Sequence, residues 1–235
     1  MAQIEQSTVR NRLLSALTPE DFGLLSPHLE AVDLPFKQVL IAPDEPITHV
    51  HFPDSGLGSM LALFEGGGSL EVGMIGQDGM VGVPVILGAE TVTQECLMQV
   101  PGTGWRMAAA ALRKATSQSP SLHAALLRYV MAFLAQVSQT AACNGAHRID
   151  ERLARWLLMA HDRCHDDRIP LTQEFLSTML GVRRAGVTVA ASTLQRAGII
   201  NYVSGDITVL NRPALEVASC ECYGIVMEQV KRLLP

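Results

Sequence analysis

The side chains with the clearest chemical capacity form a set of hydroxyl, amide and guanidinium groups between residues 172 and 196. Arg184, Thr188 and Ser192 follow one another at intervals of four residues, which places them on one face of a helix. Such groups hydrogen-bond the base edges and phosphates of DNA. The sequence therefore predicts that these three side chains read base pairs. Four neighbouring side chains are expected to contact phosphates: Thr172, Arg183, Gln195 and Arg196.

Two histidines offer a second kind of chemistry. His49 and His51 alternate on one predicted strand, so both side chains could face the interior of a barrel and bind a metal, as in cupin-like enzymes. A cupin pattern also needs a nearby glutamate, and none occurs between Glu45 and Glu65. We expect two incidental histidines, no metal and no catalytic residues.

The cysteines offer a third kind of chemistry, metal binding or redox sensing by thiols. Cys143 and His147 are four residues apart on one helical face, where they could sense a metal or an oxidant, although buried cysteine is also ordinary core packing. Cys220 and Cys222 are two residues apart, which in a helix directs them to different faces and argues against a zinc site. Five cysteines with no export signal favour reduced thiols in the cytosol.

A helix-turn-helix would position the DNA-binding groups. Thr172 is a good N-cap for a first helix, and Gly181 suits the tight turn to a second helix over residues 184–196. The segments 199–203 and 207–210 then predict a β-hairpin wing, before a final helix that begins at Asn211-Arg-Pro. Two helices with a glycine turn also occur in ordinary cores, but the arginines and the wing favour DNA binding.

The first half of the chain shows a different pattern of apolar residues and turn signals. One amphipathic helix is predicted over residues 9–29, with a fresh start at Thr18. Short runs separated by Pro and Gly then indicate an antiparallel barrel, roll or sandwich. The predicted strands cover residues 38–41, 49–52, 59–64, 70–75 and 96–100.

From about Ser119 to Asn144 the apolar period becomes helical. The spacing predicts a two-stranded dimer seam that also packs one flank on the β domain, with a helix packed only on its own β domain as the alternative. Gly145 offers a joint before the next helix, over residues 149–160. The predicted seam residues are Leu126, Val130, Phe133, Val137 and Thr140.

The net charge also differs between the two parts of the chain, with an acidic first half and a basic second half. Residues 1–105 carry 3 basic and 13 acidic groups, whereas residues 106–235 carry 15 basic and 10 acidic groups. A polyanion would therefore meet the second half. No signal peptide is apparent at the start, and no apolar stretch reaches the roughly 18 residues that a membrane span needs. We expect a cytoplasmic protein without a membrane partner.

The order of these parts resembles the Crp/Fnr superfamily of bacterial transcription regulators. The resemblance is most specific in three segments: Glu71–Gly82 (EVGMIGQDGMVG), Arg152–Leu158 (RLARWLL) and Leu171–Arg184. It implies an α+β fold with an antiparallel β-roll like a cyclic-nucleotide-binding domain (residues 1–117), a dimerisation helix (118–147) and a winged helix-turn-helix (148–235). It also implies a homodimer on a palindromic site, with RNA polymerase as a further partner of an activator.

Two departures from the family pattern matter. The effector segment would be Gly79, Met80, Val81 and Gly82, where cyclic-nucleotide-binding relatives carry Gly-Glu-Leu. No Lys or Arg occurs between Lys37 and Arg106, so a cyclic phosphate would lack its guanidinium partner and cyclic AMP is not expected. The effector, or any cofactor, is unknown.

In the recognition helix, Ala185 and Val189 replace the family's frequent Glu and second Arg, so the DNA site should differ from that of the best-known members. Two alternatives to a DNA-binding regulator stay open from the sequence. One is a metal-dependent cupin-like enzyme, and the other is an interaction scaffold that does not bind DNA.

Overall fold

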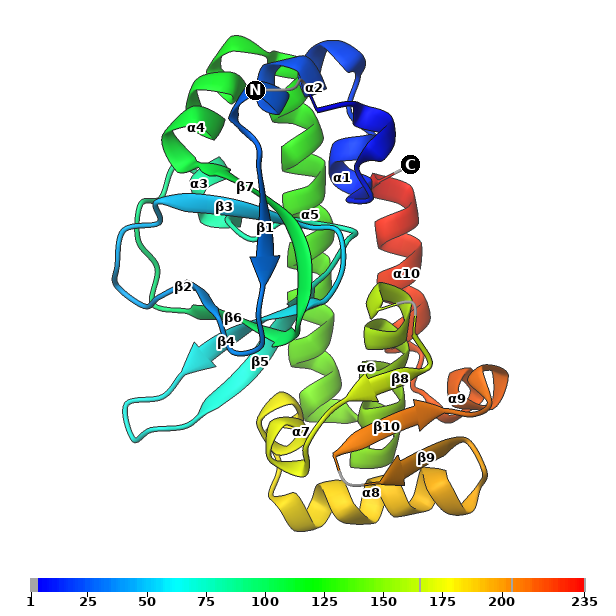
Figure 1. Ribbon diagram of the computed structural model, residues 1–235. Coiled ribbons are helices and arrows are strands. Elements are labelled where there is room, and N and C mark those ends of the chain that lie inside the picture. Colours follow the sequence, from blue (N-terminus) through cyan, green and yellow to red (C-terminus); the bar gives the residue numbers. More distant parts are fainter. Residues whose placement is uncertain (1–3, 165, 204, 235) are drawn as a thin grey trace.

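The computed structural model describes residues 4–164, 166–203 and 205–234. A β-roll with short helices forms one half of the molecule and a mixed helix–hairpin unit the other, and a long helix runs beside both (Figure 1). This α+β architecture confirms the fold class predicted from the sequence. No helix among the described residues is long and apolar enough to span a membrane.

The roll consists of two antiparallel sheets, with strand orders β1-β7-β3 and β2-β6-β4-β5. Alternation of apolar and polar residues, broken by turns that contain glycine, produces most of these strands. The sequence patterns missed β1 and β7; β1 pairs along its whole length with residues 102–106 of β7. The strands are β1 Glu30–Leu34, β2 Val39–Ile41, β3 His49–Pro53, β4 Leu57–Leu63, β5 Ser69–Ile75, β6 Glu95–Val100 and β7 Gly102–Ala108.

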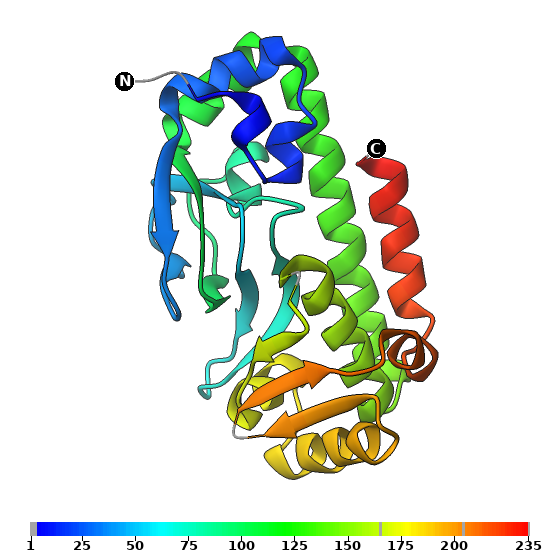
Figure 2. The ribbon, with the colours of Figure 1, turned by 45° about the vertical axis from the view of Figure 1, so that its right-hand side comes forward.

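Short helices cover the end of the roll (Figure 2). The single helix predicted over residues 9–29 is wrong, because the chain forms two separate helices there, but the fresh start predicted at Thr18 is confirmed. Asn11 caps the first, and Thr18 caps the second by accepting from the Asp21 amide. The elements are the 3₁₀ turns η1 Gln6–Thr8 and η2 Ser26–His28 and the helices α1 Arg12–Ser15, α2 Pro19–Leu25, α3 Val83–Ile86 and α4 Ala109–Gln118.

The long helix α5 (Pro120–Ala146) begins at the Ser119 cap and confirms the helix that the sequence predicted. The predicted seam, however, lies in the chain's own core. Leu126, Val130 and Phe133 belong to the β-roll's apolar cluster, Val137 packs against it, and Thr140 is buried. The heptad spacing was therefore that of a helix packed on its own domain.

The exposed side of α5 carries a second heptad-spaced row, which is displaced by one residue from the predicted seam. We call this row the outer stripe. Its large members are substantially exposed, at 38% for Leu127 and 52% each for Met131 and Leu134. The row continues with small side chains, Ser138 and Ala141.

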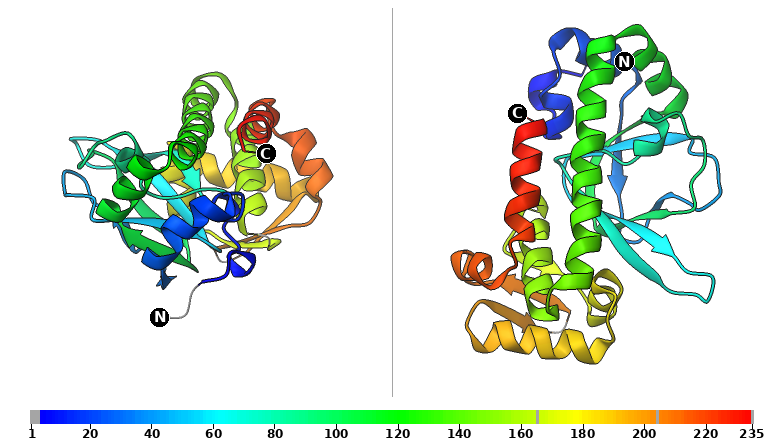
Figure 3. Two further views of the ribbon diagram at one scale, coloured as in Figure 1. Left: turned by 90° about the horizontal axis from the view of Figure 1, so that it is seen from above. Right: turned by 180° about the vertical axis from the view of Figure 1, so that it is seen from behind.

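Helices and a three-stranded sheet (order β8-β10-β9) form the second half. The break between α5 and the next helix lies at His147–Arg148 rather than at Gly145. Helix α10, which the sequence patterns did not predict, packs along α5 (Figure 3). Ser204, in the predicted wing turn, lies outside the described residues. The elements are α6 Ile149–Cys164, β8 Arg168–Pro170, α7 Gln173–Leu180, α8 Arg184–Arg196, β9 Ile200–Val203, β10 Asp206–Val209, α9 Arg212–Ala218 and α10 Cys222–Leu233.

Buried polar contacts join the roll to α6. The Trp156 indole nitrogen donates to a Glu71 carboxylate oxygen at 2.6 Å, and Glu71 also accepts from the Ser59 hydroxyl. Arg163 forms an ion pair with Asp78 at 2.7 Å, and only 5% of the Arg163 side chain is exposed. The two halves thus share an interior and contact each other directly.

Candidate nucleic-acid interface

The turn between α7 and α8 fixes the geometry of the helix pair. Gly181 adopts a left-handed conformation (φ 61°), which avoids the steric cost that a side chain would meet there. The Val182 amide donates to the Ser177 carbonyl and the Gly181 amide to the Thr178 carbonyl, as in a Schellman motif. The buried guanidinium of Arg152 on α6 donates to the Leu180 carbonyl. The end of α7 is therefore held both by the hydrogen bonds of its own turn and by the Arg152 guanidinium of α6.

Helix α8 has one buried and one exposed side. Apolar side chains at helical spacing face α6 and α7, as the sequence predicted: Val187, Ala190, Ala191 and Leu194. The opposite side carries Arg184, Thr188 and Ser192, all exposed. The hairpin β9–β10 follows directly, at the position expected for a wing.

The predicted base-reading residues are already organised by local contacts. An ion pair of 2.7 Å joins the Arg184 guanidinium to Glu174 on α7, with both side chains more than 60% exposed. An exposed pair of this kind stabilises by less than about 1 kcal/mol, so Glu174 holds the Arg184 side chain only weakly. The Thr188 hydroxyl donates to the Arg184 carbonyl. A shallow hollow of about 370 Å³ is lined by Thr188, Val189, Ser192, Gln195 and Arg196.

The predicted phosphate contacts lie around the same surface. Thr172 caps α7 by accepting from the Phe175 amide at 3.3 Å, and Arg183 precedes the first turn of α8 with an exposed side chain. The Gln195 oxygen accepts from the Tyr202 amide of β9, which leaves the Gln195 amide nitrogen available. Arg183 and Arg196 form no salt bridge within the described part of the chain.

The predicted effector segment does not border an open pocket. Met80 and Val81 are fully buried, and the Tyr129 hydroxyl on α5 donates to the Met80 carbonyl at 2.9 Å. A Cβ at Gly79 would overlap the Tyr129 ring, and one at Gly82 would overlap Val50. A space of only about 10 Å³ lies between this part of the roll, α5 and α10. The segment Gly79–Gly82 is thus closely packed against Tyr129 and Val50 in this structure, and its role as an effector segment stays a prediction.

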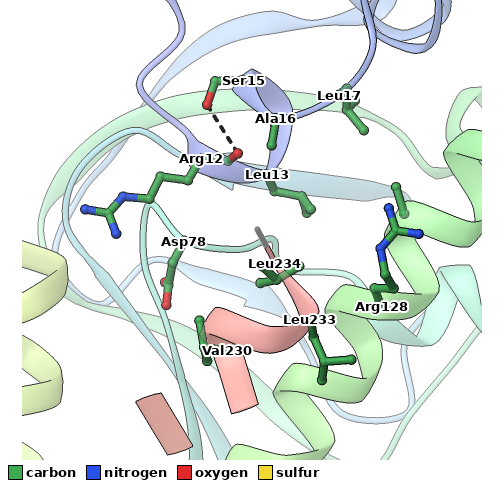
Figure 4. Close-up of a pocket in the computed structure, with 11 residues that line it drawn as sticks. Arg12, Leu13, Ser15, Ala16, Leu17, Asp78, Arg128, Val230, Leu233 and Leu234 are labelled. Carbon is green, nitrogen blue, oxygen red and sulfur yellow. Dashed lines mark hydrogen bonds between the residues drawn. The ribbon is translucent and has the colours of Figure 1, made fainter. Parts of the chain in front are cut away.

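A larger cavity of about 380 Å³ lies between α1, α5 and the end of α10 (Figure 4). Its walls include apolar side chains such as Leu13 and Leu233. Arg12, Asp78 and Arg128 supply charged groups to it. No sequence pattern pointed to this cavity, because four segments far apart in the sequence form it.

The metal candidates have different outcomes. In β3, Val50 and Phe52 belong to the roll core, so His49 and His51 lie on the other face of the strand and not in the roll interior that a cupin-like metal site would require. Burial lowers the pKa of His51 to about 4, which keeps the ring neutral. Cys143 and His147 do lie together, and Cys220 and Cys222, whose spacing argued against a zinc site, lie beside them. Helix α10 begins only at Cys222, so the helical-face argument did not apply to this pair.

Comparisons with known proteins agree with this geometry. Residues 151–218 match the Crp-like helix-turn-helix domain. FixK2 from Bradyrhizobium japonicum superposes with a TM-score of 0.70 at 17% identity, covering 82% of this chain and 98% of that chain. No curated protein sequence matches the chain significantly.

Two further solved structures with a similar fold are described as transcriptional regulators of the Crp/Fnr family. A putative Crp/Fnr-family transcriptional regulator from Eubacterium rectale gives a TM-score of 0.69 at 17% identity, with coverage of 88% of this chain and 96% of the other. A Crp/Fnr-family regulator from Thermus thermophilus gives 0.67 at 20% identity, with coverage of 81% and 98%.

The β-roll, the long helix and the winged helix-turn-helix are thus the architecture that this chain shares with the superposed structures. The chain therefore carries a Crp-like helix-turn-helix domain over residues 151–218, within a fold similar to that of these Crp/Fnr-family structures.

Proposed function

We propose that the chain acts in the cytoplasm as a homodimeric transcription regulator that reads a palindromic DNA site through α8. The observation that carries the proposal is the exposed side of α8, where Arg184, Thr188 and Ser192 project from a helix that the core holds firmly on its other side. A helix of this width fits the major groove, where base pairs present distinct donor and acceptor patterns.

Each side chain has a role that follows from its chemistry. Arg184, at the start of α8, would release Glu174 and pair with a guanine, while Thr188 and Ser192 would contact the following bases. The exposed Val189 adds an apolar contact suited to a thymine methyl group. Thr172, Arg183, Gln195 and Arg196 would hold the phosphates on either side.

The outer stripe of α5 is the surface that supports a dimer. Leu127, Met131 and Leu134 expose apolar area at the spacing of a coiled-coil seam, and the small Ser138 and Ala141 allow two helices to approach closely toward the DNA-binding end. A two-fold dimer would present two α8 helices to successive major grooves, about 34 Å apart.

A signal would act through the contacts between the roll and the DNA-binding half. Glu71–Trp156 and Asp78–Arg163 connect β5 and the loop after it to α6, which carries Arg152 beneath the helix pair. A ligand that bound differently to two arrangements of these contacts would shift the position of α8. Cyclic AMP is not the signal we propose, because Met80 and Val81 are buried and no Lys or Arg between Lys37 and Arg106 could pair with its phosphate.

The test is fluorescence anisotropy with the full-length protein and its selected DNA site. Arg184→Ala should weaken binding by about 1–3 kcal/mol and relax the preference at one base position. Arg106→Ala is the matched control, since Arg106 is an exposed, ion-paired arginine on the roll. Unchanged affinity and preference in Arg184→Ala would overturn the assignment of α8 as the reading helix.

A further inference from the structure

Three thiols and one imidazole converge where the long helix meets the DNA-binding half. Cys143 and His147 come from the end of α5, and Cys220 and Cys222 come from the turn between α9 and α10. One potential ligand atom from each of the four lies within 4.8 Å of all the others. We propose that these residues form a tetrahedral zinc site.

The distances within the cluster fit a metal of this kind. The Cys143 and Cys220 sulfurs are 3.5 Å apart, and the Cys222 sulfur lies 3.6 Å from the His147 Nδ1. Zinc binds thiolate sulfur at about 2.3 Å and histidine nitrogen at about 2.0–2.1 Å, so the edges of such a tetrahedron measure about 3.5–3.8 Å. Small movements would complete the site.

The surrounding groups orient these ligands. The His147 Nε2 lies 3.2 Å from a carboxylate oxygen of Glu221, and a proton on Nε2 leaves the Nδ1 lone pair for a metal. The Gln139 side-chain amide lies 3.0 Å from the Cys222 sulfur, where it donates to a thiolate. This carboxylate–histidine arrangement recurs in known zinc sites.

Charge is also balanced. Three thiolates, one neutral imidazole and Zn²⁺ carry a net charge of −1. Burial raises the pKa of the Cys143 thiol, while the nearby Arg155 guanidinium acts in the opposite direction. Arg155 is itself almost fully buried and donates to the Thr140 hydroxyl, so it remains close to the site. A bound cation removes the thiol protons and uses this guanidinium as the counter-charge.

The alternatives account for fewer of the groups. A Cys143–Cys220 disulfide would use two sulfurs and leave Cys222 and His147 without a role. Magnesium and calcium prefer oxygen ligands, whereas a Cys₃His set is typical of structural zinc. The three cysteines also form a small buried cluster separate from both apolar cores, so filling a core does not explain their convergence.

The position of the site indicates what it would hold. It joins the start of α10 to the end of α5, next to the break at His147–Arg148 where the chain passes into α6. Residues 143 and 220 are far apart in sequence, so the metal would close a long loop and fix the helix pair α5–α10 beside the DNA-binding half.

The direct test uses the full-length wild-type protein, reduced, stripped with EDTA and given one equivalent of zinc. We expect one zinc per chain retained through gel filtration. X-ray absorption should show three sulfurs at about 2.3 Å and one nitrogen at about 2.0–2.1 Å. No retained zinc, a shell of only oxygen and nitrogen, or a Cys143–Cys220 disulfide formed in place of metal binding would overturn the proposal.

Variants locate the bound metal. Cys222→Ser and His147→Ala should retain less zinc than the wild type, whereas Cys164→Ser, a cysteine at the end of α6 outside the cluster, should retain all of it. Zinc should raise the Tm of the wild type and of Cys164→Ser more than that of Cys222→Ser. Full retention of zinc by both site variants would place the metal elsewhere. The absorption measurement needs no variant, so a misfolded mutant cannot decide the result.

Discussion

Glu71 links the roll to the DNA-binding half and should make the stability of the protein depend on pH. Its side chain is buried and accepts from the Trp156 indole and the Ser59 hydroxyl. Burial raises the pKa of Glu71 from 4.5 to about 7, although those two hydrogen bonds and the charges of Arg155 and Arg163 oppose the shift. Glu71→Gln keeps the shape, removes the ionisation and mimics the protonated acid: its oxygen can accept from Trp156, while its amide would donate to the Ser59 oxygen, whose hydroxyl also faces the Gln99 oxygen.

The sign and size of the effect follow from proton linkage. Below pH 4.5 the carboxyl is protonated in both the folded and the unfolded state, so Glu71 does not change the free energy of unfolding there. Between pH 4.5 and about 7 the unfolded chain ionises while the folded chain keeps its proton, and the free energy of unfolding falls. At 1.36 kcal/mol for each pKa unit, the loss reaches about 3 kcal/mol by pH 7 and then stays constant.

Urea denaturation followed by tryptophan fluorescence measures this directly, because Trp156 contacts Glu71. Glu71→Gln should match the wild type near pH 4.5 and exceed its free energy of unfolding by up to about 3 kcal/mol at pH 8. Glu65→Gln, an exposed carboxylate in the β4–β5 hairpin, should behave like the wild type throughout. A Glu71→Gln protein less stable than the wild type at pH 8 would refute the reasoning, since Glu71 would then be ionised and stabilising.

Three further changes test other parts of the structure. Leu134→Glu puts a charge in the outer stripe of α5 and should convert the dimer to monomers in analytical ultracentrifugation. Leu63→Glu, at an exposed position on the roll, should leave the protein dimeric. A dimeric Leu134→Glu protein would show that the dimer seam lies elsewhere. Gly79→Ala forces a methyl group against the Tyr129 ring and should lower the free energy of unfolding by about 1–3 kcal/mol in urea titrations, an expectation that an unchanged midpoint would contradict. Arg196→Ala should weaken binding to all DNA sequences alike and reduce the slope of log K against log salt by about 1, and a change in base preference would mean that Arg196 reads bases instead.

Local signals in the sequence were enough for the helix-turn-helix. Thr172, Gly181 and the periodicity of α8 each specify backbone geometry within a few residues, and the structure has these elements where the patterns placed them. The strands β1 and β7 escaped detection because their exposed positions disturb the expected alternation of polar and apolar residues. Their pairing joins residues far apart in the sequence, and short-range patterns carry little information on it.

The misassigned seam has a definite physical cause. A helix packed on a sheet and a helix packed on a partner both show apolar residues at spacings of three and four. Helix α5 has both faces, displaced by one residue, and the sequence pattern selected the row around Phe133, which the roll covers. Only the tertiary structure separates that row from the outer stripe around Met131.

The cysteine cluster shows the same limit. Cys220 and Cys222 were judged as if both lay in a helix, but Cys220 lies in the turn before α10. The approach of this turn to Cys143 depends on how α10 packs along α5, and a helix that was not predicted could not be placed.

The central claim is that α8 reads DNA in a dimer. Selection of DNA from a randomised library by the purified full-length protein tests it most directly. We expect enrichment of a palindrome whose half-sites are about one helical turn apart, and loss of one preferred base position in the Arg184→Ala protein. Failure to enrich any sequence at low salt, with both the zinc-loaded and the zinc-free protein, would contradict it.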